Sequence, residues 1–493
     1  MISFGTLFGL LIGALPGLGA TIGICLLLPL TYKMTPLTSI LMLMALYNGG
    51  EYGGSISSII LGVPGTPGAT ATILDGYPMS KKGYPGKALG YSLTASTIGG
   101  IFGALCLMFL TLALTKVTLN FRDPEFTLLG LLGLICVAGL DSKDVYKSAV
   151  SIFLGIQTSL IGVDFFSGAK RFTFGSINLM EGFTLVSLLI GLFAVSEALI
   201  MLEGDLSKRH VTDKKNLKVG ITLKEFKNVA KDIFKGSIIG TIIGILPGLG
   251  AGPASWFSYA EAKRSSKTPE KFGEGMPNGI VAPESANNAV VGGSMIPLLT
   301  LGIPGSPAAA VIMGALMIHG VKMGPLLMKN DLELIHGIFW GFLLAVIAMF
   351  IYAKYTTTIF ARLLTLPQYA VSPIVLFLAL IGTYVPRANI FDVWVAIIVG
   401  GIAFILRKLD FSLPSFILAF ILGPILEEGF RRSLMISNGR WSIFVTRPYS
   451  ICIILLIAFM IASIAYSKIN SRKKENGDIK DDSINLDTGG LDL

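Results

Sequence analysis

The strongest constraint in this sequence is a pair of turn motifs that interrupt long apolar segments, one in each half of the chain. The first runs from Gly53 to Gly68 as GGSISSIILGVPGTPG, and the second from Gly292 to Pro307 as GGSMIPLLTLGIPGSP. In hydrocarbon, non-helical backbone is tolerated only where it is buried in protein or lines a polar cavity. Two such breaks at corresponding points of two halves therefore predict broken helices that meet at a shared site.

The composition indicates a polytopic membrane protein. Hydrophobic residues make up 53% of the 493 residues, charged residues only 14%, and the mean hydropathy is +0.73. A helix needs about 20 apolar residues to cross a bilayer. The clearest apolar runs cover residues 86–117, 125–140, 145–163, 182–202, 332–360, 392–405, 413–426 and 449–466. With the broken segments we expect an all-α fold of about a dozen crossings or re-entrant pieces.

A second repeated motif breaks the first apolar segment of each half. Leu-Pro-Gly-Leu-Gly-Ala occurs at residues 15–20 and again at 246–251. Proline removes a helical hydrogen bond and glycine loosens the backbone. The predicted structural breaks are Pro16, Gly17, Gly19, Pro247, Gly248 and Gly250. Each arm then has about a dozen residues and a length of about 18 Å, which fits a re-entrant hairpin or a broken span.

The common order of motifs indicates an internal duplication. We expect a first transmembrane repeat at residues 1–202, a polar cytoplasmic linker at 203–232 that ends in a surface helix, and a second repeat at 233–466. Residues 467–493 open with a basic cluster and then turn polar and acidic, which predicts a disordered cytoplasmic tail.

Loop charges predict that the two repeats have inverted topology. In the first half Lys33 precedes Gly-Gly-Ser, whereas Lys81, Lys82 and Lys87 follow the Pro-Gly turn. The second half reverses this balance, with Lys263, Arg264, Lys267 and Lys271 before the motif and Lys322 and Lys329 after it. Because basic loops stay cytoplasmic, corresponding loops should lie on opposite sides of the membrane. The formal charge of +9 is explained by such loops and does not indicate nucleic-acid binding.

The Pro-Gly turns are the predicted substrate site. The helices that follow them offer free N–H groups and a partial positive charge, which suit an anion. The candidate residues are Gly53, Gly54, Ser55, Gly65, Thr66 and Pro67 in the first half, and Gly292, Gly293, Ser294, Gly305, Ser306 and Pro307 in the second. The alternative is that Pro and Gly only turn the chain and Ser or Thr caps the next helix. The repetition in both halves favours a site.

Polar residues inside apolar segments are candidates for binding a coupling ion, either sodium or a proton. They are Asn48 in the first half and Glu284, Asn287 and Asn288 in the second. A carboxylate and carboxamides at membrane depth are costly unless they face a cavity or bind something. The alternative places Pro283 and Glu284 in the first turn of a helix at the membrane boundary. Glu51 does not align with Glu284, and the sequence assigns no sodium ligands.

These motifs resemble those of the large membrane subunit of the tripartite tricarboxylate transporters, the TctA family. The resemblance covers nearly the whole chain and also rests on residues 52–55, 74–79, 171–175, 282–289 and 301–307, and on Gly423, Pro424, Glu427, Arg431 and Arg432. It implies a carboxylate importer in the bacterial inner membrane, driven by sodium or protons, with a cytoplasmic C-terminus. The implied partners are a small membrane subunit and a periplasmic solute-binding protein. Family members usually carry about one more helix before the first Leu-Pro-Gly, and Glu51 is not typical of the family.

Two further function classes stay open at this level. A passive anion channel would share the composition, and an intramembrane enzyme would use Asp75 or Glu284. Enzyme and cofactor signatures do not support the latter, since a Walker lysine is missing and the three histidines lack metal-ligand spacing.

Overall fold

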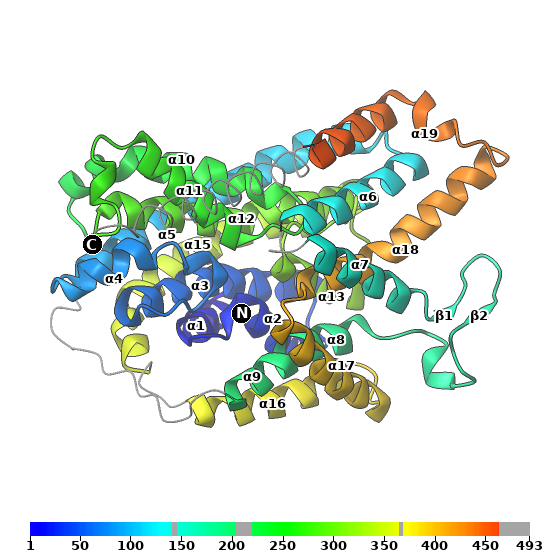
Figure 1. The fold of residues 1–493 in the computed structure, drawn as a ribbon, viewed down its shortest axis with the longest axis horizontal. Helices are drawn as coiled ribbons and strands as arrows, with labels where there is room; N and C mark the ends of the chain where they lie inside the picture. Colours follow the sequence, from blue (N-terminus) through cyan, green and yellow to red (C-terminus); the bar gives the residue numbers. More distant parts are fainter. Residues whose placement is uncertain (141–144, 204–218, 364–367, 463–493) are drawn as a thin grey trace, which may run out of the picture.

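The computed structural model describes residues 1–140, 145–203, 219–363 and 368–462, which form a bundle of helices (Figure 1). The first half contains α1 (Ile2–Ala14), α2 (Gly19–Thr31), α3 (Pro36–Leu61), η1 (Pro67–Ala69), α4 (Ile73–Lys81), α5 (Pro85–Thr118), α6 (Asp123–Leu140), α7 (Val145–Ser159), η2 (Ile177–Leu179), α8 (Leu185–Leu189), the π-helical η3 (Ile190–Val195) and α9 (Ser196–Glu203). Its strands are β1 (Gly162–Val163) and β2 (Lys170–Arg171), which pair antiparallel.

The second half repeats the opening order of helices. It contains α10 (Leu223–Ile245), α11 (Ala251–Ser265), η4 (Pro269–Lys271), α12 (Pro277–Leu301), α13 (Pro307–Ile318), α14 (Leu327–Asn330), α15 (Leu332–Leu363), α16 (Gln368–Tyr384), α17 (Ile390–Lys408), α18 (Leu413–Ile436), α19 (Ile443–Thr446) and a further helix at Pro448–Ala462. Each apolar run found in the sequence lies largely in one of these helical stretches where the structure describes it.

The outer surface confirms a multi-pass membrane protein. In the described part of the chain five helical stretches are long and apolar enough to cross a membrane: Pro85–Thr118, Leu185–Glu203, Leu332–Thr357, Ile390–Lys408 and Leu413–Ile436. Large apolar side chains stand exposed on several outer helices, for example Trp340, Trp394 and Phe459. A surface this apolar suits lipid. The predicted tail at 467–493 lies outside the described residues.

Both Leu-Pro-Gly motifs break a helix, and the arms of the second break fold back on each other. Lys235 on α10 donates to Ser265 at the end of α11, with an Nζ–Oγ distance of 3.0 Å, and lies 3.4 Å from Glu261. Of the two structures that the sequence allowed, this contact fits the hairpin. The predicted surface helix of the linker is not separate, because α10 begins at Leu223 with a capping box between Thr222 and Glu225 and continues to the break.

The duplication recurs in the packing of the backbone. The N–H of Gly65 donates to the Gly54 carbonyl at 3.3 Å, and the N–H of Gly305 donates to the Ser294 carbonyl at the same distance. A Cβ at Gly65 would lie 2.1 Å from the Gly13 carbonyl oxygen, and a Cβ at Gly305 would lie 2.1 Å from that of Gly244. The third and fourth helices of the two halves therefore correspond with an offset of 240 residues, because 294 − 54 and 305 − 65 both equal 240.

This register corrects our reading of the Gly-Gly-Ser motifs. Gly54 corresponds to Ser294, so the two motifs are shifted by one residue relative to each other. Both also lie inside the continuous helices α3 and α12, with no break there. The chain leaves each helix later, at Gly62 and Gly302, whose left-handed φ of 70° and 72° end the helix as glycine commonly does. The non-helical backbone is confined to the Pro-Gly turns that follow.

Each half packs one of its long helices against the other half. Helix α5 of the first half packs along α12, where a Cβ at Gly99 would lie 2.2 Å from the Ser285 carbonyl oxygen. Helix α15 of the second half packs on α3, where the hydroxyls of Tyr52 and Thr357 lie 3.2 Å apart. Figure 1 shows α1, α3, α5, α12 and α15 within one body of helices. Neither repeat is therefore an independent unit.

Loops from the two halves meet at two separate places. After α4, Lys82 Nζ donates to the Glu274 carbonyl at 2.6 Å, and Lys87 pairs with Glu225 at 2.7 Å. Elsewhere, His319 after α13 lies 2.9 Å from the Thr31 carbonyl through Nε2. The segment after the first Pro-Gly turn thus contacts the loop before α12, and the segment after the second Pro-Gly turn contacts the chain before α3.

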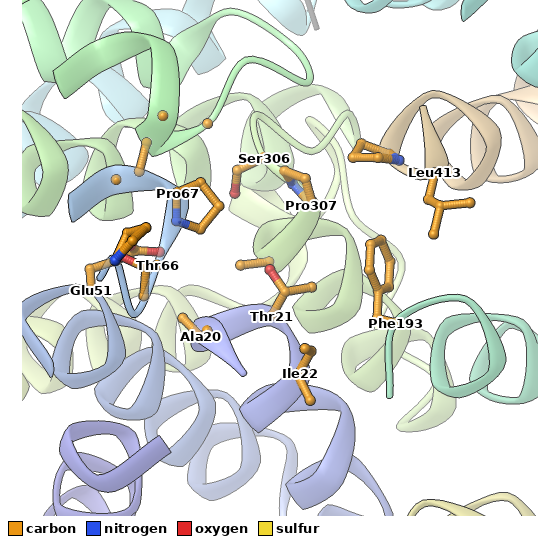
Figure 2. A pocket seen from close by; sticks show the side chains of 18 of the residues that line it. Ala20, Thr21, Ile22, Glu51, Thr66, Pro67, Phe193, Ser306, Pro307 and Leu413 are labelled. Atoms are coloured by element: carbon orange, nitrogen blue, oxygen red, sulfur yellow. The ribbon is translucent and has the colours of Figure 1, made fainter. Parts of the chain in front are cut away.

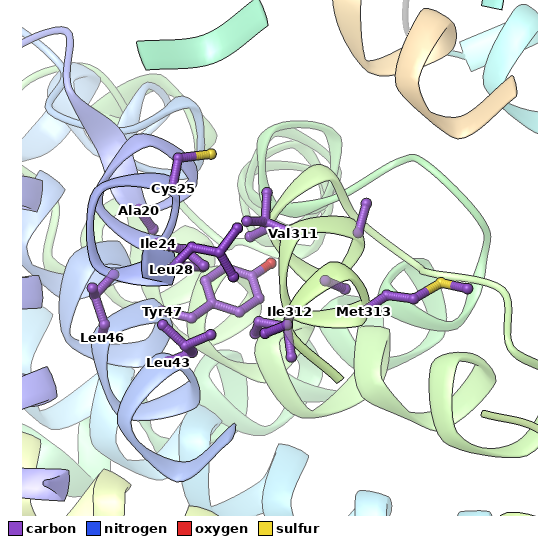
Figure 3. Packing of buried hydrophobic residues seen from close by; sticks show 14 of the residues in the cluster. Ala20, Ile24, Cys25, Leu28, Leu43, Leu46, Tyr47, Val311, Ile312 and Met313 are labelled. Carbon is purple, nitrogen blue, oxygen red and sulfur yellow. The ribbon is translucent and has the colours of Figure 1, made fainter. Parts of the chain in front are cut away.

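The largest apolar core joins α2 and α3 to α13 (Figure 3). Ile24 and Leu28 of α2, Leu46 of α3 and Val311 and Ile312 of α13 are buried there. Between helices in a membrane, such contacts stabilise through close van der Waals packing. This core fixes the start of α13 relative to the start of α2.

The β1–β2 segment projects from one side of the bundle and is tied to α18 (Figure 1). Asp164 accepts from Arg431 and from Arg171, each at 2.7 Å, and both arginines also bind Glu427. Hydrogen bonds from Arg431 and Ser167, with the charge of Arg171, hold the pKa of Asp164 well below its ordinary range. The pair of Glu427 and Arg431, four residues apart on α18, belongs to this wider network.

Candidate functional site

A cavity of about 620 Å³ forms where both Leu-Pro-Gly breaks and both Pro-Gly turns converge (Figure 2). The first half contributes residues 17–22, 64–68, Tyr47, Glu51 and Thr70, and the second contributes 248–253 and 306–308. Phe193, Glu197, Arg407 and residues 411–414 complete the lining. Segments more than 200 residues apart in sequence therefore share one site.

Three helices begin at this cavity. Helix α2 starts at Gly19, α11 at Ala251 and α13 at Pro307, and all three residues line it. The first N–H groups of a helix have no intrahelical partner and carry a partial positive charge. No side chain caps α2 or α11. The cavity therefore presents backbone donors to an anion.

The third helix start is partly occupied by its own cap. Ser306 Oγ accepts from the Ala309 N–H at 3.1 Å and from the Tyr47 hydroxyl at 3.0 Å. The capping alternative is thus correct for Ser306. It does not hold for Thr66, whose side chain caps nothing.

Arg407 is the cationic residue in the cavity lining. It comes from the end of α17 and pairs with Glu197 of α9, which also lines the cavity. We did not predict either residue. Glu197 had a usable signal, because it is a lone carboxylate within the apolar run 182–202. Arg407 follows its apolar run and had no signal that set it apart from a residue at a membrane boundary.

Five of the twelve predicted substrate residues line the cavity, namely Gly65, Thr66, Pro67, Ser306 and Pro307. The others, Gly53, Gly54, Ser55, Gly292, Gly293, Ser294 and Gly305, are absent from the lining and are buried between helices. Gly53, for example, packs against the backbone of α1, where an added Cβ would lie 2.7 Å from the Leu10 carbonyl oxygen. Their small size serves helix packing. Of the predicted breaks, Gly17, Gly19, Gly248 and Gly250 line the cavity, whereas Pro16 and Pro247 do not.

Glu284 does not lie at a helix start, so that alternative is wrong. Helix α12 begins at Pro277, two turns earlier, and Glu284 is fully buried. Its carboxylate accepts from three hydroxyls, those of Thr72 at 2.5 Å, Ser96 at 2.9 Å and Ser92 at 3.1 Å. Ser55, predicted as a substrate residue, lies 2.7 Å from Ser92 and supports this hydroxyl shell.

The remaining ion-site candidates lie behind the cavity. Asn288 Nδ2 donates to Oδ1 and to the carbonyl of Asn48, and Asn287 Nδ2 donates to the Glu51 carbonyl at 3.3 Å. Glu51, which we did not assign to the site, is the residue of this group that reaches the cavity lining. Its position inside the apolar segment of α3 was the signal that marked it.

Comparison with known proteins was consistent with this architecture. The model of the tripartite tricarboxylate transporter TctA family matches residues 1–418. An uncharacterized 52.8 kDa protein from the TAR-I ttuC' 3' region of Agrobacterium vitis is 37% identical over 90% of this chain and 88% of its own length. An uncharacterized protein from the TAR-II ttuC' 3' region of the same organism is 36% identical over 44% of this chain and 93% of its own. No solved structure matches the chain.

Proposed function

This chain belongs to the tripartite tricarboxylate transporter TctA family, and from that membership we propose that it is the translocating subunit of an ion-gradient-driven importer of a small organic carboxylate, of the tricarboxylate or dicarboxylate class. Membership makes it a transporter component and not an enzyme, so the intramembrane-enzyme alternative is set aside. Family membership does not give the direction of transport, the energy source or the substrate class, and these three points are what we propose here.

The observation that carries this proposal is the convergence of three helix starts and Arg407 on one cavity. Backbone N–H groups at helix starts bind carboxylates without a buried basic side chain. An arginine adds a bidentate donor for a carboxylate. The cavity volume of about 620 Å³ lies in the range usual for small-molecule sites, about 300–1,000 Å³.

Inverted repeats are part of the proposal. The contact of Lys82 with Glu274 groups the basic loops of the two halves in one place, and the contact of His319 with Thr31 groups the loops near Lys33 and Lys322 in another. This grouping supports corresponding loops on opposite sides of the membrane. It also supports a cavity at the interface of the repeats that opens to one side at a time.

The family implies a small membrane subunit and a periplasmic solute-binding protein as partners. We propose that the binding protein delivers the carboxylate to this cavity at the bacterial inner membrane, and that the C-terminus is cytoplasmic. The basic residues at the start of the tail, Lys468 and Arg472 among them, support that orientation.

The test is uptake of radiolabelled carboxylates into vesicles that contain both membrane subunits and the cognate binding protein. A panel of mono-, di- and tricarboxylates is tested with an imposed sodium gradient, with a proton gradient and with neither. We expect accumulation above equilibrium for one class and only with a gradient. Equilibration that stops at equal concentrations would instead favour the passive anion channel.

A further inference from the structure

Three side-chain oxygens near the cavity have no hydrogen-bond partner among the described residues. They are Oε2 of Glu51, Oγ1 of Thr66 and Oδ1 of Asn287. The three residues are 6%, 2% and 0% exposed. Leaving a buried polar atom without a partner is energetically costly, so three in one region call for a ligand.

The three oxygens surround the first Pro-Gly turn. The Thr66 hydroxyl and the Glu51 carboxylate face each other at one edge of the cavity (Figure 2), and neither Oγ1 nor Oε2 completes a hydrogen bond. The Thr66 hydroxyl faces Gly54, one turn after Glu51 on α3, where an added Cβ would lie 2.4 Å from it. Asn287 reaches the same turn from α12, because a Cβ at Gly68 would lie 2.0 Å from its Oδ1. The carboxamide is held in place by its donation to the Glu51 carbonyl.

The titratable side chains next to these oxygens are acids. Glu51 forms no ion pair among the described residues, and Glu284 is a second acidic residue near it. Arg407, the cation in the cavity lining, is paired with Glu197. A carboxylate, a hydroxyl and a carboxamide oxygen are hard ligands, which favour alkali and alkaline-earth cations over transition metals. A single carboxylate among neutral oxygens suits a monovalent cation.

We propose that Glu51, Thr66 and Asn287 bind a sodium ion at the wall of the carboxylate cavity. The inference rests on the proposed function, since it names the site through which sodium is coupled to carboxylate. Thr66 and Glu51 line both sites, so sodium there neutralises Glu51 and favours a substrate anion next to it. In the absence of sodium, Glu51 repels the carboxylate.

The test measures sodium binding without substrate. The thermal midpoint of the purified full-length chain in detergent is followed as sodium chloride replaces N-methyl-D-glucamine chloride at constant ionic strength. We expect a saturable rise for the unmodified chain. The half-saturating sodium concentration should increase at least tenfold in Glu51→Gln, Thr66→Val and Asn287→Leu.

Two matched variants act as controls. Thr300→Val removes a fully buried hydroxyl that donates to the Ile296 carbonyl, and Glu125→Gln removes a buried carboxylate that pairs with Arg447. Both should lower the midpoint without changing its sodium dependence.

The sodium site is overturned if the unmodified chain shows no sodium-dependent rise in its thermal midpoint, or if folded Glu51 and Thr66 variants show the same sodium dependence as the unmodified chain. If a lower pH raises the thermal midpoint and sodium does not, the sodium site is also overturned, and the three oxygens bind a proton instead. Sodium binding without carboxylate uptake would refute only the proposed function.

Discussion

Asn288 and Asn48 occupy equivalent positions in the two halves and bind each other directly. The Asn288 Nδ2 donates to Oδ1 and to the carbonyl oxygen of Asn48, both at 3.1 Å, and both residues are fully buried. Their separation of 240 residues equals the offset between α3 and α12. The contact therefore joins the repeats at their interface.

We predict that Asn288→Ala lowers stability because it leaves buried acceptors of Asn48 without a donor. The free energy of unfolding should fall by about 1–3 kcal/mol. The thermal midpoint in detergent measures the effect, and the double variant with Asn48→Ala measures the coupling. Additive losses in the two single variants would show that the contact is not a stabilising one.

Glu284→Gln should reduce uptake at least tenfold while the protein still reaches the membrane. Glutamine keeps the shape of the side chain, but it has one acceptor oxygen for the three hydroxyls that donate to the carboxylate. Uptake is normalised to the amount of protein in the membrane. Ser96→Ala, which removes one donor and keeps the charge, should have a smaller effect; unchanged uptake in Glu284→Gln would assign the carboxylate a structural role.

Arg407→Gln should raise KM for the carboxylate at least tenfold, because it removes the cationic side chain of the cavity lining. Lys408→Gln is the matched control, since the neighbouring lysine pairs with Glu203 and does not line the cavity. Initial uptake rates at several substrate concentrations separate KM from the maximal rate. An unchanged KM in Arg407→Gln would leave anion recognition to the helix starts alone.

Gly65→Val should lower the amount of folded protein. The sequence marks Gly65 as a candidate substrate residue, but its missing side chain makes room for the Gly13 carbonyl of α1. A Cβ 2.1 Å from a backbone oxygen forces the two segments apart. At Gly401 of α17 an added Cβ meets nothing within 4 Å, so Gly401→Val should be tolerated. The amount of protein in the membrane and its size-exclusion profile measure the effect. A Gly65→Val variant that is monodisperse and as abundant as the unmodified protein would contradict the packing argument.

Single cysteine substitutions should report inverted topology. In a cysteine-free background, the Lys81→Cys and Lys267→Cys variants should react with a membrane-impermeant maleimide only from the cytoplasmic side. The Lys33→Cys and Lys322→Cys variants should react only from the periplasm, because corresponding loops of inverted repeats lie on opposite sides of the membrane. Labelling of all four positions from one side would exclude inversion.

The membrane class, the duplication and the two kinds of break can all be read from the order of the amino acids. Hydropathy over a span and the helix-breaking chemistry of Pro and Gly are local properties. The breaks at Pro16 and Pro247 and the turns after Gly62 and Gly302 can therefore be predicted from the sequence. Converging breaks also follow from the repeat, because equivalent segments of a duplicated chain occupy equivalent places.

Which polar residues share a site depends instead on how the helices pack. A run such as Tyr52 to Ser55 is the same in sequence whether its glycines face a ligand or another helix, and here close packing of α1 on α3 uses them. The pairing of Arg407 with Glu197, the hydroxyl shell of Glu284 and the meeting of Glu51, Thr66 and Asn287 each join segments that are distant in the chain. Such contacts depend on how helices of one repeat pack against the other repeat, and no local sequence pattern encodes that packing.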